Sequence, residues 1–403
     1  MIRSVRTGLC LAGSLLAWSF TAAAQSPPST RAEEYAQRQA EKAKHTHPYA
    51  PGFLERQLLE IEAGGGFTTI RGVTVTFGGI KSGSGFAVGP LVGHIFGDGS
   101  VATAKAVISL RNYRLLQGFY QARPFLDGRV IVNGRARWQR APNGPAFPIG
   151  PDSPSQRAQY DEDRADLSAQ AFARPVSFLR LAGGTGWEKY QTSAGSVALG
   201  EDEALPAVPF LPGRSADPGY VHSYGLAALD SRESPGYSRS GTLLQAVVHD
   251  YRARSGGPYA FRRIEGAAQQ LIPILRGNMV FDLSARVWSA TPGDGQDVPF
   301  FLMPALGGGD FLRGFRNYRF RDRDAMLLTG EYRWYVQEYL DGVLFYEAGK
   351  VAPRFGDLDL DRLEKSYGIG LHLHTPNTTV LRLELARSRE GTRFIFGFTP
   401  VLF

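Results

Sequence analysis

The residues with the clearest capacity for chemistry are arginines that follow three consecutive glycines. The glycines occupy positions 307–309, where a backbone without Cβ atoms can turn tightly or pack against another backbone. Five arginines follow within eleven residues, interleaved with aromatic residues: Arg313, Arg316, Arg319, Arg321 and Arg323. This combination predicts a loop folded into a polar cavity. Nucleic-acid binding is the alternative use of interleaved basic and aromatic residues, but the rest of the chain lacks the character of a soluble domain.

The arrangements that catalysis or metal binding would require are missing from the sequence. No Gly-x-Ser-x-Gly motif occurs, and no Lys-Ser/Thr pair follows the three glycines to make a phosphate loop. Two histidine pairs, His45 with His47 and His372 with His374, have no cysteine or evident third ligand beside them. We therefore expect no enzyme, no cofactor and no metal site, and we expect these histidines to be ordinary polar residues.

The first 25 residues have the composition of a secretory signal peptide. Arg3 and Arg6 form a basic start, positions 9–20 are mostly apolar, and three alanines precede Gln25. Cys10, the only cysteine, lies inside this segment, so the exported chain would contain none. That excludes disulfides, thiolate metal sites and cysteine catalysis. Removing the two arginines lowers the formal charge from +7 to +5, a modest excess that suits contact with anionic lipid headgroups.

The composition of the remaining chain indicates a transmembrane β-barrel. No stretch after residue 25 has about 18 consecutive apolar residues, as a membrane-spanning helix requires. The chain is rich in glycine and aromatic residues, with 48 Gly, 25 Phe and 17 Tyr. Many segments alternate: Leu381, Leu383 and Leu385 face one side of a predicted strand, and Arg382 and Glu384 face the other. Charged inner and apolar outer faces fit a water-filled lumen within lipid, although a soluble β-sandwich would give the same alternation.

Fifteen segments have the pattern of β-strands. They lie near residues 67–80, 84–95, 101–121, 127–142, 157–174, 176–191, 219–230, 240–253, 258–270, 275–290, 325–337, 340–351, 365–375, 378–388 and 391–402. A membrane barrel whose two ends share one side needs an even number of strands, since an unpaired edge is costly in hydrocarbon. We therefore expect about sixteen strands, one early strand having been missed, and keep fourteen as an alternative. Long connections are predicted at 192–218 and 291–324, on the extracellular side.

These features divide the chain into three predicted parts. Residues 1–25 form the signal peptide, residues 26–66 a periplasmic linker, and residues 67–403 an all-β transmembrane antiparallel β-barrel. Within the linker, residues 53–61 place their apolar side chains on one helical face, which predicts a short amphipathic helix. Residues 26–50 have little apolar content, so disorder is an equal alternative for them.

The arginine-rich loop also resembles a known family. Leu312-Arg313-Gly314-Phe315 resembles the [V/L]-R-G-[F/Y] signature of the BamA/TamA superfamily, the bacterial surface antigen family of outer-membrane barrels that assemble or translocate other proteins. Residues 330–334 and 345–349 are similar to the next two family motifs in the same order, with a glutamate in place of an aspartate in the second. Upstream, residues 230–242 and 259–265 also resemble family barrel segments. The resemblance covers roughly residues 67–403.

The resemblance implies a site as well as a fold. In the family the signature lies on the sixth extracellular loop of a sixteen-stranded barrel and folds back into the lumen. Its arginine contacts acids at the positions of Glu331 and Glu347, so Arg313 is expected to form bidentate pairs that fix the loop. Without the resemblance, these residues would be interpreted as ordinary hydrated lumen charges. The last strand, which ends on Phe403, resembles the segment by which outer-membrane proteins are recognised and inserted.

The implied function is insertion or translocation of proteins at the outer membrane of a Gram-negative bacterium. The expected partners are outer-membrane lipid and either client outer-membrane proteins or a periplasmic partner, with no nucleic acid. The N-terminal segment is too short for the repeated periplasmic POTRA domains of family members that assemble other proteins. This departure leaves two alternatives open, a pore or channel gated by the inserted loop and a surface-antigen barrel without assembly activity.

Overall fold

The computed structural model describes residues 38, 41, 72–155, 157–195, 211–214, 216–254 and 256–398. Four sequence predictions fall outside these residues and remain predictions: the signal peptide at 1–25, all but two residues of the linker at 26–66, the amphipathic helix within that linker, and the terminal residue Phe403. The described strands begin at Gly72 and end at Phe398.

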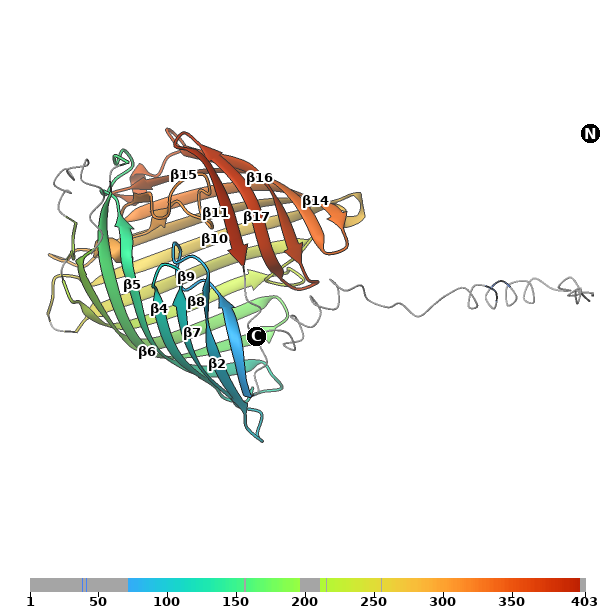
Figure 1. Cartoon of the computed structure of the whole chain (residues 1–403), viewed down its shortest axis with the longest axis horizontal. Coiled ribbons are helices and arrows are strands. Elements are labelled where there is room, and N and C mark those ends of the chain that lie inside the picture. The colour runs from blue at the N-terminus through green and yellow to red at the C-terminus, as the bar shows by residue number, and fades with distance from the viewer. Residues whose placement is uncertain are drawn as a thin grey trace, which may run out of the picture. The chain divides into compact units, whose positions relative to one another are not determined.

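One antiparallel sheet of sixteen strands forms the described domain, and it curls so that its first strands (blue) and last strands (red) both lie on the near side of Figure 1. In pairing order the strands are β1 (Gly72–Gly78), β2 (Ala87–Ile95), β3 (Val101–Ser109), β4 (Arg114–Gln121), β5 (Val130–Ala146), β6 (Ala158–Val176), β7 (Leu179–Ala194), β8 (Gly219–Asp230), β9 (Gly241–Ala253), β10 (Phe261–Ile274), β11 (Met279–Pro292), β14 (Asp324–Gln337), β15 (Leu340–Ala352), β16 (Glu364–His374), β17 (Thr379–Ser388) and β18 (Gly391–Phe398). Short elements occur in the connections: the pair β12 (Ala305–Leu306) and β13 (Phe320–Arg321), and the 3-10 helices η1 (Leu275–Gly277), η2 (Phe300–Leu302) and η3 (Phe355–Asp357). The predicted all-β antiparallel barrel is confirmed.

The strand missing from the sequence-based count follows a turn without the usual turn residues. The segment 101–121, predicted as one strand, is divided into β3 and β4 by residues 110–113, which include no glycine or proline. Asn112 takes the left-handed conformation there, at φ 60°, which asparagine adopts more readily than most residues. The Ser109 hydroxyl accepts a hydrogen bond from the Tyr113 backbone N–H at 3.1 Å and closes the turn. The prediction of sixteen strands is confirmed, and the alternative of fourteen is wrong.

The outer wall of the barrel is apolar and the inner wall is largely polar. Leu283, Ile369 and Leu385 are each about half exposed, whereas the next residue before Leu385, Glu384, is only 1% exposed. A soluble β-sandwich would bury its apolar face between two packed sheets. The single sheet with exposed apolar residues excludes that alternative. No helix within the described residues is both long and apolar enough to cross a membrane.

The two ends of the sheet meet the same rim of the barrel. Because an even number of antiparallel strands alternates in direction, the start of β1 and the end of β18 share one rim, here called the terminal rim. The opposite rim, here called the loop rim, carries the connection from β11 to β14 at residues 293–323. Within the described residues, no hydrogen-bonded pairing joins β1 to β18. We call this unpaired junction the seam.

Candidate functional site

The connection between β11 and β14, residues 293–323, folds into the barrel and is here called the lumen loop. Four of its apolar side chains form a cluster with inward-facing residues of β14 and β15, and each of the four is at most 2% exposed: Leu306, Leu312, Phe315 and Phe320. The pairing of β12 with β13 joins the two ends of this segment. The lumen loop therefore has a packed core of its own, which positions the polar residues between its ends.

Glycines allow the loop backbone to approach the barrel wall. Gly307 has a φ of 104°, a conformation in which other residues are strained. A Cβ atom on Gly314 would lie 2.8 Å from the carbonyl carbon of Arg387, too close for any residue but glycine. The Gly314 N–H donates to the Ser366 hydroxyl at 2.7 Å, and the Ser388 hydroxyl donates to the Gly314 carbonyl at 2.8 Å. Strands β16 and β17 thus hold the loop by its main chain.

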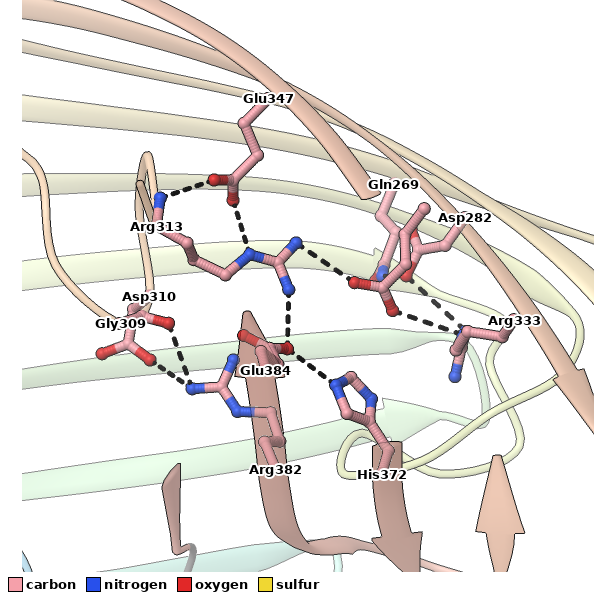
Figure 2. Close-up of polar contacts among 11 residues, drawn as sticks. Gln269, Asp282, Gly309, Asp310, Arg313, Arg333, Glu347, His372, Arg382 and Glu384 are labelled. Carbon is pink, nitrogen blue, oxygen red and sulfur yellow. Dashed lines mark hydrogen bonds and ion pairs between the residues drawn. The ribbon is translucent and has the colours of Figure 1, made fainter. Parts of the chain in front are cut away.

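Arg313 binds three carboxylates that come from three different strands (Figure 2). Its Nε donates to Glu347 of β15 at 3.0 Å, its Nη1 to Glu384 of β17 at 2.8 Å, and its Nη2 to Glu331 of β14 at 3.2 Å. The Glu347 carboxylate also accepts the backbone N–H of Arg313 at 2.6 Å. Every guanidinium nitrogen therefore donates to a carboxylate, in a planar arrangement that arginine alone among the side chains can provide. We call these four residues the arginine latch.

The latch is nearly dry and carries more negative than positive charge. Arg313, Glu347 and Glu384 are 4%, 1% and 1% exposed. Burial alone would lower the pKa of the Arg313 guanidinium, but the charges of Glu347, Glu331 and Glu384 raise this pKa above its usual value. His372 lies with its Nε2 2.7 Å from the Glu384 carboxylate and adds positive charge whenever it is protonated. Removing the arginine would leave buried carboxylates without their main cation.

Phe345 accounts for the spacing of the motif at 345–349. The centroid of its ring lies 3.5 Å from Cζ of Arg313, well within the range of a cation–π contact. Phe345 and Glu347 are two residues apart on β15 and share its inner face. One of these residues packs against the face of the guanidinium, and the other accepts hydrogen bonds from its edge.

The other four arginines of the loop have different environments. Arg319 is 1% exposed and forms an ion pair with Glu390 at 2.5 Å. Arg321 is 3% exposed and packs on two aromatic rings. Within the described residues, Arg316 and Arg323 have no ion-pair partner. The arginine run is therefore not one binding surface, because its members point to separate parts of the interior.

The structure brings both predicted acids to Arg313 and adds two partners, while Leu312 and Phe315 pack in the apolar cluster of the loop. The signature at 312–315 lies within the loop, and Arg313 contacts both Glu331 and Glu347. Sequence reasoning missed Glu384 and His372 as partners. Alternation correctly places Glu384 on the inner face of its strand, but the pairing of β17 with β16 decides which inward residue reaches the loop. The register between two strands cannot be predicted from the sequence of either strand alone.

A second connection, residues 231–240 between β8 and β9, also folds inward, from the terminal rim. We call it the terminal-rim loop. The Tyr237 hydroxyl and the Arg239 Nη2 both donate to the carboxylate of Asp341 at 2.7 Å. The Tyr237 ring stacks on His374 with 3.8 Å between centroids. Since five strands lie between β8 and β16, this loop bridges distant parts of the wall. Its sequence belongs to the family-like segment 230–242, but the inward fold was not predicted.

The two histidines at 372 and 374 belong to separate clusters and do not share a ligand. His372 contacts the arginine latch, whereas His374 contacts the terminal-rim loop. In the part of the chain that the structure describes, no three His, Cys, Asp or Glu side chains come together in a way that could hold a metal ion.

A single barrel with an apolar outer wall, a charged interior and a loop fixed inside the lumen defines a transmembrane β-barrel of the outer-membrane class. Comparison with known families matches residues 94–398 to the Omp85 superfamily domain. The chain belongs to the Omp85 superfamily, and it is an outer-membrane protein. The family assignment also agrees with the prediction that the chain is not an enzyme. The described residues include no POTRA domain.

Solved structures of other barrels share the fold. BamA from Haemophilus ducreyi lacking POTRA domains 1–3 superposes with a TM-score of 0.61 at 14% identity, over 81% of this chain and 69% of that one. CdiB from Escherichia coli superposes with a TM-score of 0.52 at 11% identity, over 81% of this chain and 60% of that one. These identities are low, so the likeness is one of fold. A search of curated proteins found no significant match.

Proposed function

We propose that this barrel inserts or translocates proteins at the outer membrane through the seam between β1 and β18. The observation that carries the proposal is the seam itself: within the described residues, β1 pairs with β2 and β18 with β17, and no backbone pairing joins β1 to β18. A free edge presents N–H and C=O groups on which another strand can be added by backbone hydrogen bonds. A client strand entering the bilayer would find such a template on either side of the seam.

The surroundings of the seam support this use. A cavity of about 740 Å³ is lined by the end of β1, the β1–β2 connection, β18 and the lumen loop. On one side, Asp310 of the loop forms an ion pair with Arg382 of β17 at 2.8 Å. On the other side, Asn317 of the loop lies against Gly83 of the β1–β2 connection. The lumen loop thus contacts both sides of the seam, so release of the arginine latch would change the seam as well.

Cross-linking the seam tests the proposal. Because Cys10 is the only native cysteine, introduced cysteines can be joined selectively with a bifunctional maleimide. The pair Val75→Cys and Phe396→Cys would tie β1 to β18. The matched control, Leu383→Cys with Phe396→Cys, would tie β18 to β17, its partner in register.

Each protein would be reconstituted in liposomes, and the insertion rate of a urea-unfolded outer-membrane barrel would be measured. We expect the unmodified protein to accelerate insertion, the seam cross-link to abolish the acceleration, and the control cross-link to preserve it. Acceleration that survives a complete seam cross-link, or no acceleration by the unmodified protein, would contradict the proposal. The second result would favour the surface-antigen alternative.

A loop-gated pore is the second candidate, and the charged inner wall favours it. On the inner wall of strands β5 to β8, acids and bases alternate in contact: Arg137 with Asp166 at 2.7 Å, Arg164 with Glu188 at 3.1 Å, and Glu188 with His222 at 2.9 Å. Such a wall suits water and ions. Deleting residues 306–322 should raise single-channel conductance in planar bilayers if the loop occludes this path, and unchanged conductance would argue against a gated pore.

A periplasmic partner is part of the main proposal. Omp85 barrels act on client proteins in the outer membrane. If this chain works without POTRA domains, a separate periplasmic protein would bind the clients and deliver them to the barrel. Affinity purification from outer membranes after reversible cross-linking tests this inference. Recovery of lipid alone would count against such a partner.

A further inference from the structure

A polar cavity of about 930 Å³ lies at the loop rim, between the lumen loop and the wall. Its lining includes four arginines from four different elements: Arg111 from the β3–β4 turn, Arg157 from the end of the β5–β6 connection, Arg316 from the lumen loop and Arg393 from β18. The volume is within the range of small-molecule sites. Positive charge is therefore gathered around one space by parts of the chain that are far apart in sequence.

These charges are not neutralised from within the protein. Glu390 is the one acidic residue in the described lining, and its carboxylate is already paired with Arg319. Across the described residues, no carboxylate forms an ion pair with Arg157, Arg316 or Arg393. The Nη1 atom of Arg393 is buried and lacks a hydrogen-bond partner. A buried donor in this state is costly, and an anion in the cavity would satisfy it.

Repulsion between the arginines also favours an anion in the cavity. Burial lowers the pKa of Arg157, and the neighbouring charges of Arg316 and Arg111 lower it further. Arg111 donates to the Gly83 carbonyl at 2.9 Å, which orients its guanidinium without cancelling its charge. Four cations around one cavity are stable together when a multiply charged anion lies between them.

The neutral part of the lining indicates what else the ligand carries. Side-chain amides and hydroxyls surround the arginines, among them Asn143, Gln159, Ser155 and Thr392. These groups both donate and accept hydrogen bonds and suit a molecule rich in hydroxyl groups. We propose that this cavity binds a phosphorylated sugar, with the arginines on its phosphates and the neutral side chains on its hydroxyls.

A phosphorylated sugar can belong to a membrane glycolipid or to a soluble molecule, and the position of the cavity suits both. The arginine-lined cavity and the cavity at the seam adjoin, because they share four lining residues: Gly83, Arg111, Asn317 and Arg393. A glycolipid with a phosphorylated glucosamine headgroup could reach the arginine-lined cavity from the membrane by way of the seam. A soluble phosphorylated sugar could reach it from the loop rim.

The experiment uses the full chain in phosphatidylcholine nanodiscs. Glucose 1,6-bisphosphate is the soluble probe, measured by calorimetry, and diphosphoryl lipid A incorporated in the nanodisc is the membrane probe, measured by native mass spectrometry. The test variant is Arg157→Gln with Arg316→Gln. The control is Arg389→Gln, which removes an arginine of the same region that is paired with Glu364 outside this cavity.

We expect at least one probe to bind, with an affinity reduced tenfold or more in the double variant and unchanged in the control. Binding of the soluble probe alone identifies a free sugar phosphate, and binding of lipid A alone identifies a membrane glycolipid; both results support the site. Absence of binding by either probe overturns the proposal, as does an equal loss in Arg389→Gln. Heat-modifiable gel mobility confirms that each variant has kept its barrel.

Discussion

The lumen loop and the terminal-rim loop enter the same barrel from opposite rims, but they are attached in different ways. The lumen loop contributes one cation, Arg313, which meets three carboxylates from three strands. The terminal-rim loop contributes two donors, Tyr237 and Arg239, which meet one carboxylate, Asp341. It also has a backbone contact with the β16–β17 turn, through Gly236. In the lumen loop one buried side chain joins three strands, beside the main-chain contacts of Gly314 and the packed apolar cluster. In the terminal-rim loop the polar side chains meet at one carboxylate.

This difference indicates which of the two loops can move while the barrel strands stay in place. A loop whose buried carboxylates depend on one main cation can change state when that cation is removed, because buried carboxylates without it are strongly destabilising. A loop held by several modest contacts loosens gradually as each is removed. We therefore expect the lumen loop to act as the two-state element of this barrel and the terminal-rim loop to act as a fixed brace.

The largest effect is expected from Arg313→Ala. The change leaves three carboxylates close together, two of them almost fully buried, at a cost of about 3–5 kcal/mol to the docked loop. The loop should open often enough for trypsin to cleave between residues 316 and 323 about 100-fold faster or more, since every 1.4 kcal/mol corresponds to about tenfold. Cleavage kinetics in intact outer membranes measure this rate. A rate equal to that of the unaltered protein would show that the latch does not hold the loop.

The three carboxylates should not be equivalent. Glu347 accepts both the Nε and the backbone N–H of Arg313, so Glu347→Gln should cost about 1.5–3 kcal/mol. Glu331 has a more exposed side chain and a second cation in Arg333, so Glu331→Gln should cost about 1 kcal/mol or less. The same cleavage assay compares the two variants. The reverse order would mean that the geometry of the latch is wrong.

A smaller effect is expected at the terminal-rim loop. Tyr237→Phe removes one donor from Asp341 while Arg239 keeps its own contact, so the loss should be about 1 kcal/mol. Hydrogen exchange of residues 231–240 should become roughly fivefold faster, while exchange in the lumen loop stays the same. Acceleration of both loops together would show that they are coupled and that the proposed contrast fails.

The smallest effect is expected from Arg389→Ala. Its ion pair with Glu364 lies at the surface, with 57% of the arginine side chain exposed. Exposed pairs contribute about 0–1 kcal/mol, so tryptic cleavage of the lumen loop should change by about fivefold or less. A change approaching that of Arg313→Ala would mean that general charge at the loop rim, and not the latch, keeps the loop in place.

The late strands could be predicted from the local sequence pattern, but the full set of contacts inside the barrel could not. Residues 379–388 form a strand within one residue of the prediction because Leu381, Leu383 and Leu385 alternate with polar residues and turn residues lie on both sides of the strand. The turn at 110–113 was missed because Asn112 adopts its conformation without a glycine or proline beside it. Glu384 was missed as a partner of Arg313 because its place in the latch depends on strand register. The missed turn is a local feature without the usual turn residues, whereas the missed member of the latch is decided by long-range pairing, which no local pattern encodes.

Photo-cross-linking at the β1 side of the seam in living cells would show directly whether client proteins pass there. A photoreactive amino acid at Val75 would report on the seam, and one at Ile264 of β10 would be the control, since both side chains are about half exposed on the outer wall. We expect adducts with newly exported outer-membrane proteins at Val75 and none at Ile264. Equal adducts at both positions, or none at Val75 while such proteins are being exported, would contradict this expectation.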